Sequence, residues 1–168
     1  HQRLGQIERA LKAWRQALKR APQRLQLYLD ISNRCRATGL YQAAIQILVD
    51  GRATLEQDRL FSRELAALYL LNEEYFRAVT SYLDYLEQEP RRFASIEHRL
   101  LAVARDAARA PGLVQALKDA RKSAGDPLQV SLLLSSCALE AGDPWTGYQV
   151  LSEIVDIPEV APILFQFA

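Results

Sequence analysis

Apolar residues follow a helical spacing along nearly the whole chain. Ala44 and Leu48, for example, lie four positions apart, which places them on one face of a helix. Single Gly or Pro residues separate the apolar stretches, as at Gly39 and Pro90, where a helix is expected to stop. The pattern therefore predicts an all-α chain of short helices joined by tight turns.

The helical stretches also repeat with a spacing of 34 residues. An internal period of this length is typical of arrays of paired helices. Pro22 and Pro90 close two of the units, because proline is excluded from a helix interior. The matching sets are Gly5, Ile7, Ala10, Trp14 and Ala17; Gly39, Tyr41, Ala44, Leu48 and Gly51; and Glu73, Tyr75, Ala78, Tyr82 and Tyr85.

Each matching position has a use in a helical hairpin. Gly5 and Gly39 fall where one helix ends and the chain turns, a position that favours positive φ. The Ala that follows, such as Ala44, lets the two helices approach closely. The larger residue four positions later, such as Leu48, fills the space between hairpins. These features predict two antiparallel helices in each unit.

These residues resemble the tetratricopeptide repeat, which has Gly at its turn, Ala early in its second helix, a large residue on the inner face and Pro at its end. The resemblance implies a right-handed α-solenoid of about 4.5 repeats in a single domain over residues 1–168, which we expect to be part of a longer protein. The expected units are 1–24 (partial), 25–58, 59–92, 93–127 and 128–161, with 162–168 beginning a further helix.

Several positions depart from the repeat. The fourth unit is one residue longer and has Gly112 in place of Ala, although Pro111 predicts the start of its second helix. The fifth unit recovers the turn at Gly142, whereas Glu56 replaces the closing Pro of the second unit and Glu73 the turn Gly of the third. A pentatricopeptide array, which has a period of about 35 residues and binds RNA, is the nearest alternative. The two successive steps of 34 favour the tetratricopeptide pattern.

The resemblance further implies that the first helix of each pair lines a concave groove for a protein partner. We expect this groove to be largely apolar and to accept an amphipathic helix or an extended apolar segment, with Arg36 and Arg63 at its polar ends. The alternative is that several of its leucines pack between hairpins. Binding of chaperone C-terminal tails is not expected, because Leu29 stands at a position where that activity needs a basic side chain. The predicted groove residues are Leu29, Asn33, Arg36, Leu60, Arg63, Ala67, Leu70, Glu97, Leu101, Leu132, Ser136 and Leu139.

Charge is distributed unevenly along the chain. Residues 1–36 hold nine Lys or Arg and two acidic residues, whereas residues 123–168 hold six acidic residues and no Lys or Arg. Such a gradient could join copies head to tail, although it is more often the solvated surface of an elongated array. Nucleic-acid binding is not favoured, because the overall net charge is only +1. The apolar residues Ile163, Leu164, Phe165 and Phe167 suggest self-association through that end of the chain.

Catalytic motifs are missing from the sequence. His98 lies between Glu97 and Arg99 and is expected at the surface, while Cys35 and Cys137 lie in apolar helical patterns and are expected to be buried. We therefore expect no active site, no metal, no cofactor and no membrane span. The sequence predicts a protein-binding scaffold. The alternative is a regulatory or targeting region of a larger enzyme or envelope assembly, whose chemistry lies elsewhere.

Overall fold

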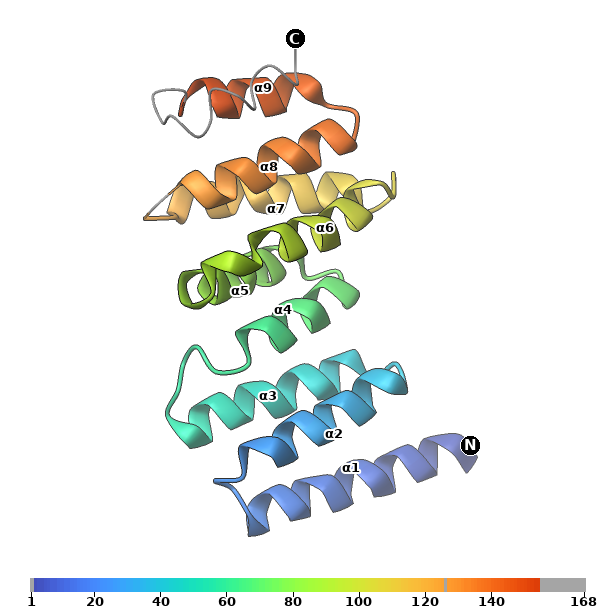
Figure 1. Ribbon diagram of the computed structural model, residues 1–168. Coiled ribbons are helices and arrows are strands. Elements are labelled where there is room, and N and C mark those ends of the chain that lie inside the picture. The colour runs from blue at the N-terminus through green and yellow to red at the C-terminus, as the bar shows by residue number, and fades with distance from the viewer. Residues whose placement is uncertain (1, 126, 155–168) are drawn as a thin grey trace. The chain divides into compact units, whose positions relative to one another are not determined.

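A computed structural model describes residues 2–125 and 127–154, and those residues form helices and turns with no strand among them (Figure 1). The chain divides between Asn72 and Glu73 into two compact units, unit 1 and unit 2. The helices of unit 1 are α1 (Gln2–Arg20), α2 (Leu25–Ala37), α3 (Tyr41–Leu55) and α4 (Ser62–Leu71). Unit 2 contains α5 (Tyr75–Gln88), the short 3₁₀ helix η1 (Pro90–Arg92), α6 (Phe93–Ala104), α7 (Ala110–Ser123), α8 (Leu128–Glu140) and α9 (Pro144–Ser152).

The turns confirm most of the predicted hairpin boundaries. Gly39, Glu73 and Gly142 all have left-handed φ, of 77°, 61° and 82°. Glu73 adopts a backbone conformation that glycine adopts more easily than other residues. The turn therefore recurs at this position of the 34-residue period although the residue is not glycine. Pro111 lies in the first turn of α7, as predicted.

Two predicted features of the first helices are wrong. Gly5 lies inside α1 and does not form a turn, because a glycine in a long helix destabilises it by only about 1 kcal/mol. Leu60 was placed on a first helix, but α4 begins two residues later, at Ser62. The reason is Phe61, whose φ of 59° lies outside the helical region.

Small and large residues pack between the helices as the repeat requires. Ala44 and Ala78 are fully buried, as are Leu48 and Tyr82 one turn later. Gly112 stands where Ala was expected because a Cβ atom there would lie 2.8 Å from the ring of Tyr75. The degenerate fourth unit thus loses its Ala to make room for an aromatic ring.

A polar contact recurs between successive hairpins. The guanidinium of Arg52 on α3 donates to the hydroxyl of Ser62 at 2.9 Å, and that of Arg121 on α7 donates to Ser131 at 2.8 Å. The two pairs lie 69 positions apart, the sum of one step of 34 and one of 35, and both serines are buried. At the intermediate position the chain has two buried apolar residues instead, Leu86 and Ile96. We name these contacts the Arg–Ser pairs.

Candidate protein-binding face

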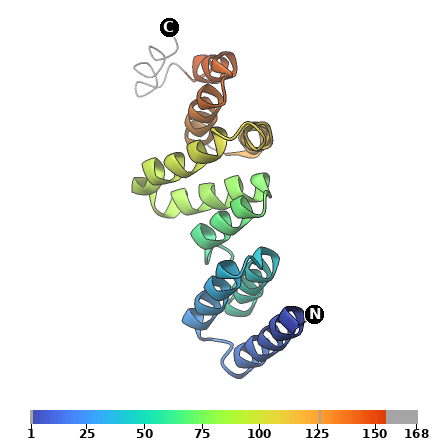
Figure 2. The same cartoon turned by 90° about the vertical axis from the view of Figure 1, so that its right-hand side faces the viewer.

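The first helices of unit 2, α6 and α8, pack side by side and in front of α5 and α7 in the view of Figure 1. Figure 2 shows the same unit from the side, with α6 and α7 on opposite sides. Ser136 donates to the carboxylate of Glu97 at 2.6 Å, and Arg105 donates to that of Glu140 at 2.7 Å. Because residue numbers rise together along both helices, α6 and α8 run in the same direction. Two polar contacts therefore join this pair of helices.

Three predicted groove leucines lie on this helix pair. Leu101 on α6 and Leu132 on α8 are half-buried, and Leu139 near the end of α8 is 38% exposed. Glu97 and Ser136 are also half-buried and bond to each other. The structure thus brings together all five groove residues predicted in unit 2. We call these five residues the α6–α8 face.

A cleft of about 350 Å³ lies at the ends of α6 and α8. The ion pair between Arg105 and Glu140 forms part of its wall, together with Asp143. Because most of the remaining wall consists of small apolar side chains, the cleft can accept a compact apolar group. Those side chains are Ala104, Ala107, Ala110, Pro111, Val114 and Ala141.

The predicted groove residues of unit 1 have mixed environments. On α2, Leu29 is half-buried while Asn33 and Arg36 are exposed. On α4, Leu70 is only 9% exposed, so its side chain belongs to the packed interior, as the alternative interpretation expected for some leucines. The remaining predicted residues are Leu60 and Ala67, which are half-buried, and Arg63, which is exposed and pairs with Glu64.

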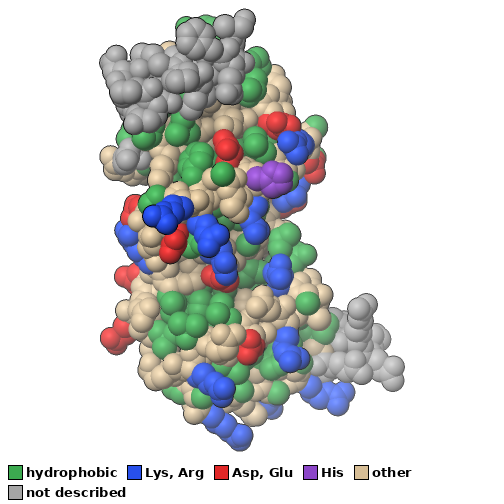
Figure 3. Space-filling model, viewed as in Figure 1, with side chains coloured by type: hydrophobic (Ala, Val, Ile, Leu, Met, Phe, Trp, Pro, Cys, Tyr) green, Lys and Arg blue, Asp and Glu red, His purple; other side chains and the backbone are tan. Residues whose placement is uncertain are grey.

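The surface seen in Figure 3 is mixed in character. Hydrophobic side chains form patches that are separated by Lys, Arg, Asp and Glu side chains. Single exposed apolar side chains are ordinary on protein surfaces, and contiguous ones usually mark an interaction site. In the α6–α8 face the leucines lie on the same two helices as the bonded pair Glu97 and Ser136, so we describe the face as an apolar strip with polar neighbours.

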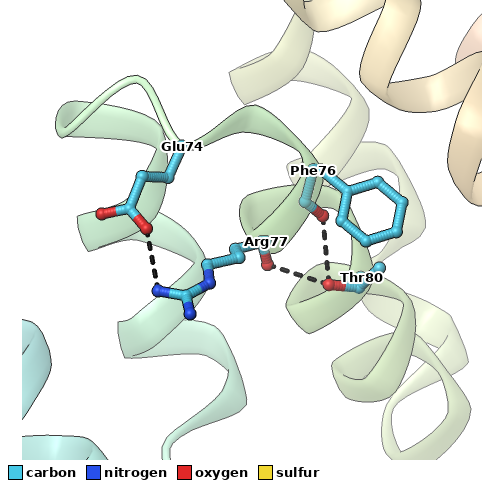
Figure 4. A network of polar contacts seen from close by, with 4 residues as sticks. All are labelled: Glu74, Phe76, Arg77 and Thr80. Carbon is cyan, nitrogen blue, oxygen red and sulfur yellow. Dashed lines mark hydrogen bonds and ion pairs between the residues drawn. The ribbon is translucent and has the colours of Figure 1, made fainter.

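Exposed aromatic residues on the second helices escaped the sequence analysis. Trp145 and Tyr148 on α9 are 65% and 46% exposed, and their rings stack with centroids 5.9 Å apart. Phe76 on α5 is also exposed, beside the hydrogen bonds that Thr80 donates to the carbonyls of Phe76 and Arg77 (Figure 4). The signal that could have indicated them is an aromatic residue directly after the turn, on the side opposite the small residue of the repeat.

The two cysteines and His98, which the sequence analysis considered for chemistry, differ in exposure. Both cysteines are buried, and burial raises the pKa of Cys35 and raises that of Cys137 to about 12. His98 is exposed on α6, as predicted. Among the described residues, no three His, Cys, Asp or Glu side chains are grouped to hold a metal ion. None of the helices in the described ranges is both long and apolar enough to cross a membrane.

Residues 163–167, from which self-association was predicted, lie outside the described residues. In comparisons with known proteins, the chain matches no family model and no curated protein.

Proposed function

We propose that this chain is a non-catalytic scaffold of tetratricopeptide-like helix pairs, and that the α6–α8 face binds an apolar segment of a partner protein. The observation that carries the proposal is the partial exposure of Leu101, Leu132 and Leu139 on two parallel first helices. A helical or extended partner segment that covered these side chains would remove apolar surface from water, at about 25 cal/mol per Å².

The polar contacts of the face support the same proposal. Glu97 on α6 and Arg105 just after it bond to Ser136 and Glu140 on α8, and the two helices pack side by side without a partner. A preformed binding surface loses less conformational entropy on binding than a mobile one. We expect the partner to bind with little rearrangement of α6 and α8.

The cleft beside Arg105 suggests how the partner is positioned. Its small apolar wall residues leave room for one compact side chain of the partner at the end of the strip. The partner would then place several apolar residues along the leucines and one in the cleft, the spacing of anchors that an amphipathic helix provides.

A peptide-display selection on the purified chain tests this function. The selected peptides should be amphipathic, and Leu139→Glu should weaken their binding by about tenfold or more, because a buried, unpaired carboxylate opposes association. Val49→Glu on α3 is the matched control, since Val49 is 37% exposed and Leu139 is 38% exposed. Equal loss in both variants, or no loss in either while circular dichroism shows intact helices, would refute the proposal.

A further inference from the structure

A second cleft of unit 2 lies between the second helices α7 and α9. Its volume is about 460 Å³, and its wall also includes Leu134 of α8 and Pro127, which directly precedes α8. Lys118, Arg121 and Lys122 of α7 face Thr146, Gln149 and Glu153 of α9 across it. The α6–α8 face shares none of these residues, so the α7–α9 cleft is a separate feature.

Two of the three cations in the α7–α9 cleft are neutralised by nearby acids. Lys122 forms an ion pair with Asp119 at 2.9 Å. Arg121 donates to Glu153 at 2.6 Å and to the buried hydroxyl of Ser131 at 2.8 Å, so its guanidinium is held in place on two sides. Neither cation is therefore an open position for an incoming anion.

Lys118 differs from its two neighbours. Lys118 is half-buried as a residue, its ammonium contacts the hydroxyl of Thr146 at 3.4 Å, and no carboxylate in the described part of the chain lies within ion-pair distance of it. Asp143 is near enough for Lys118 to lower its pKa, but that carboxylate caps α9 by accepting a hydrogen bond from the backbone of Thr146 at 3.1 Å. Thr146 holds the pKa of Asp143 below its usual range, and Lys118 adds to this at longer range.

The ammonium of a half-buried lysine with one weak neutral partner can still take an anionic partner. The cleft beside it offers the other requirements of a small binding site, because Val150 and Leu134 supply apolar wall and the amide of Gln149 supplies a hydrogen-bond donor. A ligand group with a single negative charge, placed beside the Lys118 ammonium, would supply that partner. A phosphate dianion fits less well, since Arg121 already uses its guanidinium within the protein.

We propose that the α7–α9 cleft binds a carboxylate of an acidic protein segment, with Lys118 as its ion-pair partner and Gln149 as a second donor. The apolar wall takes the methylene groups next to that carboxylate. This site is independent of the α6–α8 face, so a partner could use either one or both.

Titration of the ¹⁵N-labelled chain with short peptides, followed by NMR, tests the proposal. The probes are acetyl-Ala-Leu-Glu-Ala-amide, the same peptide with Gln for Glu, acetyl-Ala-Leu-Gln-Ala with a free terminal carboxylate, and inorganic phosphate. We expect the two carboxylate peptides to shift the amide signals of Thr146 and Gln149. Their affinity should exceed that of the neutral peptide by about tenfold, the range of one charge-assisted contact.

Variants of the lysines separate this site from general attraction to a basic surface. Lys118→Met should remove the preference for carboxylate and Lys118→Arg should keep it. Lys122→Met is the matched control, because the Lys122 ammonium is already paired with Asp119. It should change the affinity less than threefold, which corresponds to about 0.65 kcal/mol of binding free energy. Circular dichroism checks that each variant is folded. Equal binding of the neutral peptide, stronger binding of phosphate, equal loss in both Met variants, or no shift with any probe would each overturn the proposal.

Discussion

At the scale of single residues, burial decides the chemistry of the cysteines. Cys137 is fully buried and its pKa is raised to about 12, so at pH 8 only about one thiol in 10⁴ is ionised. We expect Ellman's reagent to react slowly with both cysteines in the folded chain and rapidly after unfolding in denaturant. Rapid reaction of Cys137 in the folded chain would show that this helix is not packed as described.

The same burial affects stability at alkaline pH. Because the thiol of Cys137 stays protonated in the folded chain above its ordinary pKa of 9.0, its contribution to stability is complete below about pH 9. That contribution is lost as the pH rises from 9 towards 12. Burial of the neutral thiol thus contributes its full stabilisation only below this pH range.

A second prediction at this scale concerns Gly112. Its replacement by Ala would place a Cβ atom 2.8 Å from the ring of Tyr75, whose hydroxyl accepts a hydrogen bond from Arg109 at 3.2 Å. Since the ring is held at both ends, we expect Gly112→Ala to lower the free energy of unfolding by about 1–3 kcal/mol in a urea titration. Gly125→Ala is the control, because nothing lies within 4 Å of a Cβ atom there. Equal stability of the two variants would mean that Tyr75 does not pack on Gly112.

At the scale of elements, the Arg–Ser pairs link α3 to α4 and α7 to α8, in each case a second helix to the first helix that follows it. Arg121→Leu would leave the buried hydroxyl of Ser131 without this donor and should reduce stability by about 1–3 kcal/mol. Adding Ser131→Ala should recover part of the loss, giving a coupling energy of about 0.5–3 kcal/mol in a double-mutant cycle. At the intermediate position both residues, Leu86 and Ile96, are buried and apolar. Additive effects of the two substitutions would contradict the coupling.

Helix boundaries show what the sequence could and could not reveal. The turn at Gly39 was predictable because few other residues adopt a φ of 77°, and the turn at Glu73 followed from the 34-residue period despite its residue type. The start of α4 was missed, since the left-handed conformation of Phe61 is imposed by its burial in the packed interior and not by its local preference.

The candidate site was predictable to a similar degree. The helical period brought Leu132 and Leu139 to one side of α8, and the structure places both at least partly in solvent. Leu70 occupies the same position of the repeat as Leu139 but is buried. Period alone does not separate the two, because exposure depends on which neighbouring helix covers each side chain. The α7–α9 cleft was missed for the same reason, since Lys118 and Gln149 meet only in three dimensions.

At the scale of the whole molecule, the charge gradient of the sequence is weaker in three dimensions than along the chain. Glu140 and Glu153, which belong to the acidic final third, pair with Arg105 and Arg121 from the balanced middle at 2.7 and 2.6 Å. Exposed pairs of this kind add little to stability, but they place a positive charge next to each of these two acids on the surface that a partner meets. The uneven charge therefore gives little support to head-to-tail association of copies.

Our two proposals place partner sites on two separate faces of unit 2. The α6–α8 face offers a strip of leucines between fixed polar contacts, and the α7–α9 cleft offers Lys118 beside an apolar wall. An apolar partner should use the first and an acidic segment the second. The same partner could carry both features, in which case the two sites would raise its affinity together.

The central claim, that α6 and α8 form the protein-binding face, is tested most directly by hydrogen–deuterium exchange of the chain with and without a peptide selected by display. We predict slower exchange in Phe93–Ala104 and Leu128–Glu140 when the peptide is bound, with no change in Tyr41–Leu55. Protection confined to α9 or to unit 1, with α6 and α8 unchanged, would contradict the account.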